Sequence, residues 1–170
     1  MLKPMVNTVF LRFVITNLVF MASFVCHADF TASEINAMLA AHNQVRSGVT
    51  PPAANMTRLV WDPNLATVAQ NWANQCNWSH NAGRTTAYAT LSSNSGQVGE
   101  NIYVTTRPRA DALSGPNSAI QLWVAEVADY NYSTNTCAAG QVCGHYTQLV
   151  WANTLRVGCA VTQCPSLVGL

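Results

Sequence analysis

Positively charged side chains are scarce in this chain of 170 residues, and charged residues of all kinds make up only 9% of it. The chain has a single lysine, Lys3. Without residues 1–28, which contain Lys3 and Arg12, 6 of the 8 basic residues remain against 7 acidic ones, a net charge of −1. Phosphate backbones need a basic patch, so this composition excludes nucleic acid as a partner.

Signature motifs of hydrolases and zinc sites are also missing. The sequence contains no GxSxG, no HExxH and no CxxC, which are the arrangements that place a nucleophile or metal ligands at fixed spacing. Beyond residue 28 there are only three glutamates and three histidines: Glu34, Glu100, Glu126, His42, His80 and His145. Acid–base or metal chemistry therefore has few candidate residues.

The amino terminus has the pattern of a secretory signal peptide over residues 1–28. Lys3 and Arg12 precede a mostly apolar run from Phe13 to Val25, and Ala28 is the small residue that a signal peptidase prefers. The run of about 13 residues is too short for a confident membrane span. We expect a secreted, extracellular protein (periplasmic in a bacterium) with one domain over 29–170; an uncleaved signal anchor is the alternative.

Five cysteines remain after the signal peptide: Cys76, Cys137, Cys143, Cys159 and Cys164. In an exported protein they predict disulfides, and the odd number leaves one cysteine unpaired. Asn55, Asn77 and Asn131 begin N-x-Ser/Thr sequons, which are glycan acceptors if the host is a eukaryote.

Capping signals and hydrophobic spacing predict three helices. The first begins at Thr31, whose capping box with Glu34 is clear, and ends at Gly48. The second begins at Asp62-Pro63 and ends near residue 77. The third runs from residue 119 to about 130, capped by Asn117 or Ser118. The intervening segments 48–58, 81–97, 105–117 and 131–143 are predicted loops.

Strands are predicted for 98–104, for 144–151 and for 156–162, the last as an antiparallel partner of the second. The stretch Gly144–Trp151, GHYTQLVW, is rich in strand formers. Alternation along a strand would place His145, Thr147, Leu149 and Trp151 on one face. The predicted fold class is α+β, with helices packed on an antiparallel sheet.

The candidate site follows by elimination among the few ionisable groups. Glu34 is a helix cap, and His42 lies on an apolar helix face where a core histidine is expected. The four that remain are His80, Glu100, Glu126 and His145. Each lies on a different element near a junction, so we hypothesise that they converge on one cleft.

Several sequence blocks resemble the CAP superfamily, which contains cysteine-rich secretory, antigen 5 and pathogenesis-related class 1 proteins. They are HNxxR at 42–46, WSH at 78–80, GENI at 99–102, WVAEVADYNY at 123–132 and GHYTQLVW at 144–151. The resemblance implies a three-layer α-β-α sandwich with a central antiparallel sheet and a cleft lined by all four candidates. It also implies that His80 and His145 bind a divalent metal, often zinc. Two protein ligands are fewer than a catalytic zinc site uses, so we expect weak binding.

The resemblance further implies the disulfides Cys137–Cys143 and Cys76–Cys164, with Cys159 unpaired. Family domains usually continue into another strand, so we expect a shortened domain that lacks its last strand. The implied function is non-enzymatic binding of sterols or other lipids, with Tyr130 and Tyr132 in the lipid-binding loop and a defence or host-interaction role. A membrane surface is a compatible partner, although no transmembrane segment is predicted. The alternatives are a His/Glu or metal-dependent hydrolase and a purely structural interaction domain.

Overall fold

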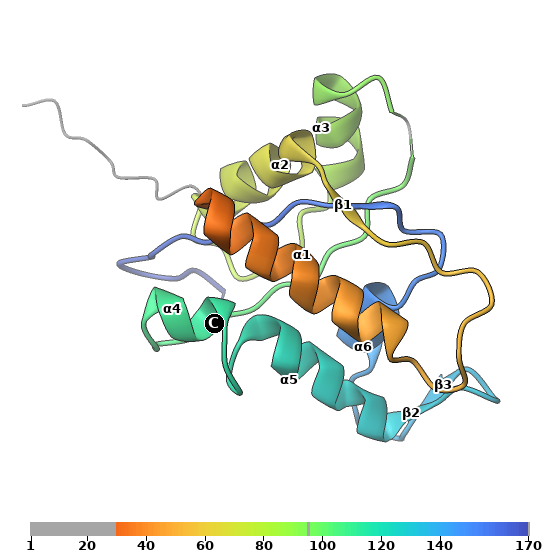
Figure 1. Cartoon of the computed structure of the whole chain (residues 1–170). Coiled ribbons are helices and arrows are strands. Elements are labelled where there is room, and N and C mark those ends of the chain that lie inside the picture. Colours follow the sequence, from red (N-terminus) through yellow and green to blue (C-terminus); the bar gives the residue numbers. More distant parts are fainter. Residues whose placement is uncertain (1–29, 95, 170) are drawn as a thin grey trace, which may run out of the picture.

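Helix α1, Ala32–Ser47, passes through the middle of the molecule and contacts β1, α5 and α6 (Figure 1). This computed structural model describes residues 30–94 and 96–169, so the predicted signal peptide lies outside the described residues. Within these two ranges, no helix is both long enough and apolar enough to span a membrane. The capping box predicted for α1 is present: the Glu34 N–H donates to the Thr31 hydroxyl at 3.2 Å, and the Thr31 N–H donates to the Glu34 carboxylate at 2.8 Å.

The remaining elements are short and follow in chain order. They are β1 (Val60–Trp61), α2 (Pro63–Ala73), α3 (Arg84–Leu91), α4 (Arg109–Leu113), α5 (Ala119–Ala125), the 3-10 helix η1 (Glu126–Asp129), β2 (Tyr130–Asn131), β3 (Thr136–Cys137), α6 (Gly144–Leu149) and β4 (Arg156–Val157). The predicted third helix is thus α5 continued by one 3-10 turn.

The sheets are smaller than the sequence suggested. In the described residues, β1 pairs with β4 in parallel and β2 pairs with β3 antiparallel, each as a two-stranded sheet. The central antiparallel sheet of a three-layer sandwich is not confirmed. The prediction that 156–162 pairs antiparallel with 144–151 is wrong, because β4 lies beside β1 instead, as the blue and yellow segments in Figure 1 show.

The prediction of a strand at 144–151 is wrong: Gly144–Leu149 is helix α6. Tyr146 and Leu149, three residues apart, are both buried, the spacing that places two side chains on one helix face. Residues four apart also share a helix face, so His145 lies on the same side of α6 as Leu149. Thr147, two residues further along, does not share that face, contrary to the strand prediction.

Three further predictions also fail. The predicted loops 81–97 and 105–117 contain α3 and α4. The predicted strand 98–104 is not a strand and pairs with no strand of the described residues. Two of its carbonyl groups are bound by side chains: Arg84 donates to the Val98 carbonyl and Trp123 to the Ile102 carbonyl. At these two carbonyls, side-chain donors take the place of a neighbouring strand.

A buried carboxylate, that of Asp62, links α2 to α3. Asp62 is 3% exposed, caps α2 through the Asn64 and Leu65 N–H groups, and accepts a 2.6 Å hydrogen bond from the Tyr88 hydroxyl. Burial acts to raise the pKa of Asp62, but the hydrogen bonds, that of Tyr88 first, outweigh it and the pKa lies below its ordinary value. Tyr88 thereby fixes α3, which the sequence did not predict, against α2.

Candidate functional site

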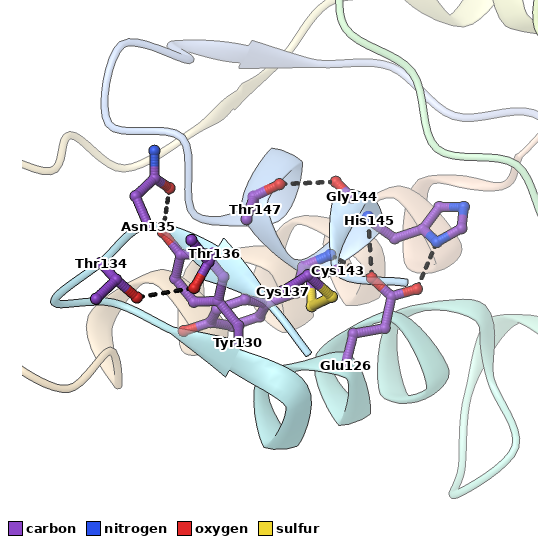
Figure 2. The surroundings of a disulfide bond; sticks show 11 residues. Glu126, Tyr130, Thr134, Asn135, Thr136, Cys137, Cys143, Gly144, His145 and Thr147 are labelled. Atoms are coloured by element: carbon purple, nitrogen blue, oxygen red, sulfur yellow. Dashed lines mark hydrogen bonds and ion pairs between the residues drawn. A yellow bond between two sulfur atoms is a disulfide. The ribbon is translucent and has the colours of Figure 1, made fainter. Parts of the chain in front are cut away.

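His145 lies on α6 and its imidazole is hydrogen-bonded to Glu126 of η1 (Figure 2). The imidazole Nδ1 lies 2.5 Å from the Glu126 Oε1, and the ring stacks on the Trp123 indole with centroids 5.9 Å apart. The two side chains are 26% and 15% exposed, so the pair is largely covered. Because the carboxylate accepts from Nδ1, the lone pair on Nε2 remains available for a ligand.

Glu126 also caps the beginning of α6. Its Oε2 accepts hydrogen bonds from the backbone N–H groups of His145 and Tyr146, both at 3.0 Å. The first N–H groups of a helix have no partner within it, and a carboxylate is favoured at this positive end of the helix dipole. One carboxylate thus positions both the backbone and the ring of His145.

His80 follows α2 and forms a second pair, with Glu100. Its Nδ1 lies 2.8 Å from the Glu100 Oε1, which also accepts the Asn81 N–H at 2.9 Å. The His80 side chain is 55% exposed and that of Glu100 only 17%. The arrangement repeats the first one: a covered carboxylate holds Nδ1 and a backbone N–H.

A single segment, residues 99–102, contacts both pairs. Glu100 binds His80, while the next residue, Asn101, donates from its side chain to the His145 carbonyl at 3.0 Å. Ile102 accepts at its carbonyl from Trp123, on which His145 stacks. The structure therefore joins His80 to Glu100 and His145 to Glu126, and ties the two pairs to one segment.

The four predicted residues do not contact one another across the two pairs. In the ranges that the structure describes, no hydrogen bond or ion pair links one pair to the other, and no group of three or more His, Cys, Asp or Glu side chains could hold a metal ion. A single cleft lined by all four stays a prediction.

Arg46, in the HNxxR block, supports α6 from its other end. The side chain is 3% exposed and donates five hydrogen bonds of 2.9–3.3 Å to the carbonyls of Thr57, Leu149, Trp151 and Thr154. A cation suits the negative, carbonyl end of a helix. Helix α6 is consequently held between an anion at its first turn and a cation at its last.

The other two residues of that block are structural. His42 is buried and its Nδ1 lies 2.8 Å from the Met38 carbonyl; burial lowers the pKa of His42, so the ring stays neutral at pH 7. Asn43 bonds both backbone groups of Leu59, at 3.1 and 2.7 Å. Asn43, Arg46 and Asn101 are supporting residues whose individual roles the sequence did not give, although all three lie in the motif blocks.

The predicted lipid-binding loop is a hairpin beside the first pair (Figure 2). Tyr132 is 65% exposed, whereas the Tyr130 hydroxyl donates to Asn135 at 2.7 Å and its ring contacts Tyr146. The disulfide Cys137–Cys143 joins the hairpin to the residue that precedes α6. Tyr130 is therefore an anchor of the loop, and Tyr132 is the side chain it presents to solvent.

The second disulfide joins Cys76 to Cys164, with Cα atoms 5.6 Å apart. Both pairs are those implied by the family resemblance, and Cys159 has no disulfide partner among the described residues. Burial raises the pKa of the Cys159 thiol to about 12, so it stays protonated near neutral pH.

Two hollows lie apart from the His/Glu pairs. One, of about 400 Å³, lies between α1 and the segment from α4 to α5, and its lining includes the small or apolar residues Ala37, Ala41, Leu113, Gly115, Pro116 and Ile120. The other, of about 600 Å³, is polar and includes Asp62, Tyr88 and Arg156 in its lining. Sequence reasoning predicted neither, since each is formed by elements distant in the chain.

The chain belongs to the CAP family, described as the cysteine-rich secretory protein family, whose pattern matches residues 39–169. It is similar to glioma pathogenesis-related protein 1 of Mus musculus, with 37% identity over 92% of this chain and 61% of the relative. It is 42% identical to GLIPR1-like protein 1 of Homo sapiens over 79% of the chain and 53% of that protein, and 38% identical to human cysteine-rich secretory protein 2 over 74% and 47%. The chain thus covers about half to three-fifths of these relatives.

The chain also resembles solved structures. The crystal structure of Na-ASP-1 matches with a TM-score of 0.63 and 27% identity, over 82% of this chain and 37% of that one. Venom allergen-like protein 4 of Schistosoma mansoni matches with a TM-score of 0.57 and 24% identity, over 79% and 83% of the two chains. The second likeness concerns the fold alone.

Proposed function

We propose that this chain is a secreted, non-enzymatic member of the CAP family that binds sterols or other lipids, with a role in defence or host interaction. Secretion is supported by the signal-like residues 1–28, by the family's description as secretory and by the two disulfides.

The hollow between α1 and α5 carries the lipid proposal. Its volume of about 400 Å³ falls within the ~300–1,000 Å³ typical of small-molecule sites, which are mostly apolar with a few polar groups. Ala37 and Ala41 are small side chains on α1 that leave room beside Leu113 and Ile120. Ser118 and Gln121 supply polar groups at the same hollow, as a hydroxyl-bearing or carboxyl-bearing lipid requires. The exposed Tyr132 is a second candidate contact.

The test is saturable uptake of a labelled sterol and of a labelled fatty acid by the purified protein. Ala37→Phe places a ring in the hollow and is expected to abolish uptake, because the space is lost. Ala40→Phe is the matched control: it makes the same change at an exposed α1 position outside the hollow. Lipid uptake that survives Ala37→Phe but disappears in Tyr132→Ser would move the site to the hairpin, and no saturable uptake by the parent protein would refute lipid binding.

We further propose weak binding of a divalent metal, such as Zn²⁺, at His80 and His145. Each ring is oriented through Nδ1 by a carboxylate, which is the outer-shell arrangement found at metal-bound histidines. Two imidazole ligands are fewer than a complete protein cage uses, and within residues 30–94 and 96–169 no group of three or more His, Cys, Asp or Glu side chains could hold a metal ion. Bound metal would supply a Lewis acid there. Calorimetric titration with zinc should give heat that disappears in His80→Ala and in His145→Ala; unchanged heat in both variants would rule this site out.

A hydrolase using the same pairs is the second candidate. The Glu–His pairs are the observation that favours it, since a carboxylate-oriented histidine can act as a general base. It predicts turnover of a peptide or ester substrate that Glu100→Gln abolishes while the protein still unfolds at the same denaturant concentration. Turnover that persists in Glu100→Gln would reject this mechanism.

A further inference from the structure

The three sequons differ sharply in how the fold holds their asparagines. All three asparagines are exposed. Asn55 lies in the segment between α1 and β1, which runs along the edge of the molecule (Figure 1). Its side chain makes no hydrogen bond to the described residues, so a group attached to its amide would displace nothing in the fold.

The Asn77 sequon is held tightly by its backbone. Asn77 follows Cys76, which is tied to Cys164 and has a positive φ of 50°, and it pairs with Val168 in an isolated β-bridge. The next residue, Trp78, donates its N–H to the Val168 carbonyl at 2.7 Å. An enzyme that modifies the Asn77 side chain and needs residues 77–79 in an extended form can act only before the disulfide and the β-bridge form.

The fold holds Asn131 less tightly than Asn77 but more tightly than Asn55. It lies in β2, opposite Thr136, and its side-chain oxygen accepts the Thr134 N–H at 3.2 Å. By contrast, the Thr57 hydroxyl of the Asn55 sequon makes no hydrogen bond to the described residues; only the Thr57 carbonyl is used, by Arg46. The fold depends on the Thr57 backbone and leaves its side chain and that of Asn55 free for an enzyme.

From these differences we propose that Asn55 is an N-glycosylation site of this protein, and the most fully occupied of its three sequons. The inference rests on the secretion proposed above and on a eukaryotic host; the similar relatives described above are mammalian proteins. N-x-Ser/Thr in a surface loop of a secreted protein is the recognised acceptor. The glycan, a bulky polar group, covers the segment that joins α1 to β1.

The reaction is a glycosyl transfer from a lipid-linked oligosaccharide. A bond forms between the Asn55 side-chain nitrogen and C1 of the first sugar, and the bond from C1 to the lipid pyrophosphate breaks. The nitrogen loses one proton, the lipid pyrophosphate leaves, and nothing is oxidised or reduced.

The test is cell-free translation of the full chain with endoplasmic-reticulum microsomes. Protease protection reports import, and glycosidase release in heavy-oxygen water marks each asparagine that carried a glycan. We expect the Asn55 peptide to be marked more fully than the Asn77 or Asn131 peptide. Asn55→Gln and Thr57→Ala should abolish its mobility shift, and Thr57→Ser should keep it, because a hydroxyl is retained.

An imported chain whose Asn55 peptide is unmarked, or less marked than Asn77 or Asn131, overturns the proposal and leaves secretion intact. A chain that is not protected refutes the proposed signal peptide instead. The same measurement is then made with residues 1–28 replaced by an established cleavable signal, so that occupancy of Asn55 is decided independently of export.

Discussion

Arg46 gives the most demanding test of how this fold holds its candidate site. Its guanidinium is buried, has no carboxylate partner among the described residues, and donates to four backbone carbonyls, two of them at or just beyond the end of α6. We predict that Arg46→Met lowers the free energy of unfolding more than the substitution of an exposed residue does. Methionine fills part of the volume of the arginine but leaves these carbonyls without donors.

The magnitude follows from the five hydrogen bonds. A hydrogen bond from a charged donor contributes ~1.5–3 kcal/mol net. Five such bonds added together would approach the ~5–15 kcal/mol total stability of a domain, so the bonds cannot be independent. A buried carbonyl left without a donor costs ~1–3 kcal/mol, and a single substitution rarely costs more than ~4–5 kcal/mol in all, so ~3–5 kcal/mol is the expected loss for Arg46→Met. Arg46→Lys keeps the charge but places its three donors on one atom, so ~1.5–3 kcal/mol is expected.

The assay is urea unfolding of the disulfide-intact protein, followed by tryptophan fluorescence. Arg58→Met makes the same chemical change at an exposed arginine with no hydrogen bond to the described residues, and should alter the free energy of unfolding by less than ~0.5 kcal/mol. Amide exchange should rise in 144–157 in Arg46→Met and not in Arg58→Met. A loss below about 1 kcal/mol in Arg46→Met, with unchanged exchange, would refute the claim that Arg46 holds α6.

Three further perturbations test separate parts of the structure. Because burial lowers the pKa of His42, the unfolded chain binds a proton more readily; the free energy of unfolding should fall as pH drops below about 6.5 and depend less on pH in His42→Gln. Gly158→Ala should cost ~1–3 kcal/mol in urea unfolding, since the added Cβ would lie 2.2 Å from the Ala66 backbone nitrogen. The Cys159 thiol should react with iodoacetamide in denaturant and hardly at all in the folded protein, because burial raises its pKa to about 12.

Each of these has a contrasting outcome. An identical pH dependence in His42→Gln and the parent protein would assign the effect to other groups. Gly144→Ala, where a Cβ meets nothing within 4 Å, is the control for Gly158→Ala, and equal losses in the two variants would contradict the packing argument. Equal rates of Cys159 alkylation in the folded and unfolded protein would show that the thiol is open to solvent.

Local signals were sufficient where a few neighbouring residues satisfy one another. The Thr31 and Glu34 capping box and the Asp62 cap with Pro63 require only contacts within one turn, and both helices begin where these signals predict. His42 was expected as a core histidine for a similar reason, since its helix periodicity gives its face and its Nδ1 partner lies four residues earlier in the same helix.

The segment GHYTQLVW, residues 144–151, is where the prediction from local sequence failed. Tyr, Thr, Val and Trp favour strands, yet its first six residues, Gly144–Leu149, form a helix, because intrinsic preference amounts to a few tenths of a kcal/mol per residue and tertiary contacts outweigh it. Glu126, nineteen residues before His145, binds the first N–H groups of this helix. Arg46, about a hundred residues away, binds the carbonyl of its last residue, Leu149, and that of Trp151 just beyond it. Neither contact is visible in a window of local sequence.

The sequence by itself determined the family, the candidate residues and, through the family resemblance, the pairing of the cysteines, because these depend on residue identity at matched positions. Only the tertiary structure decided that the candidates form two histidine–carboxylate pairs, that segment 99–102 connects those pairs, and that β4 lies beside β1. Such pairings join residues 19 to over 90 positions apart, and the side chains that meet across these distances are selected by packing of the whole chain rather than by the local pattern.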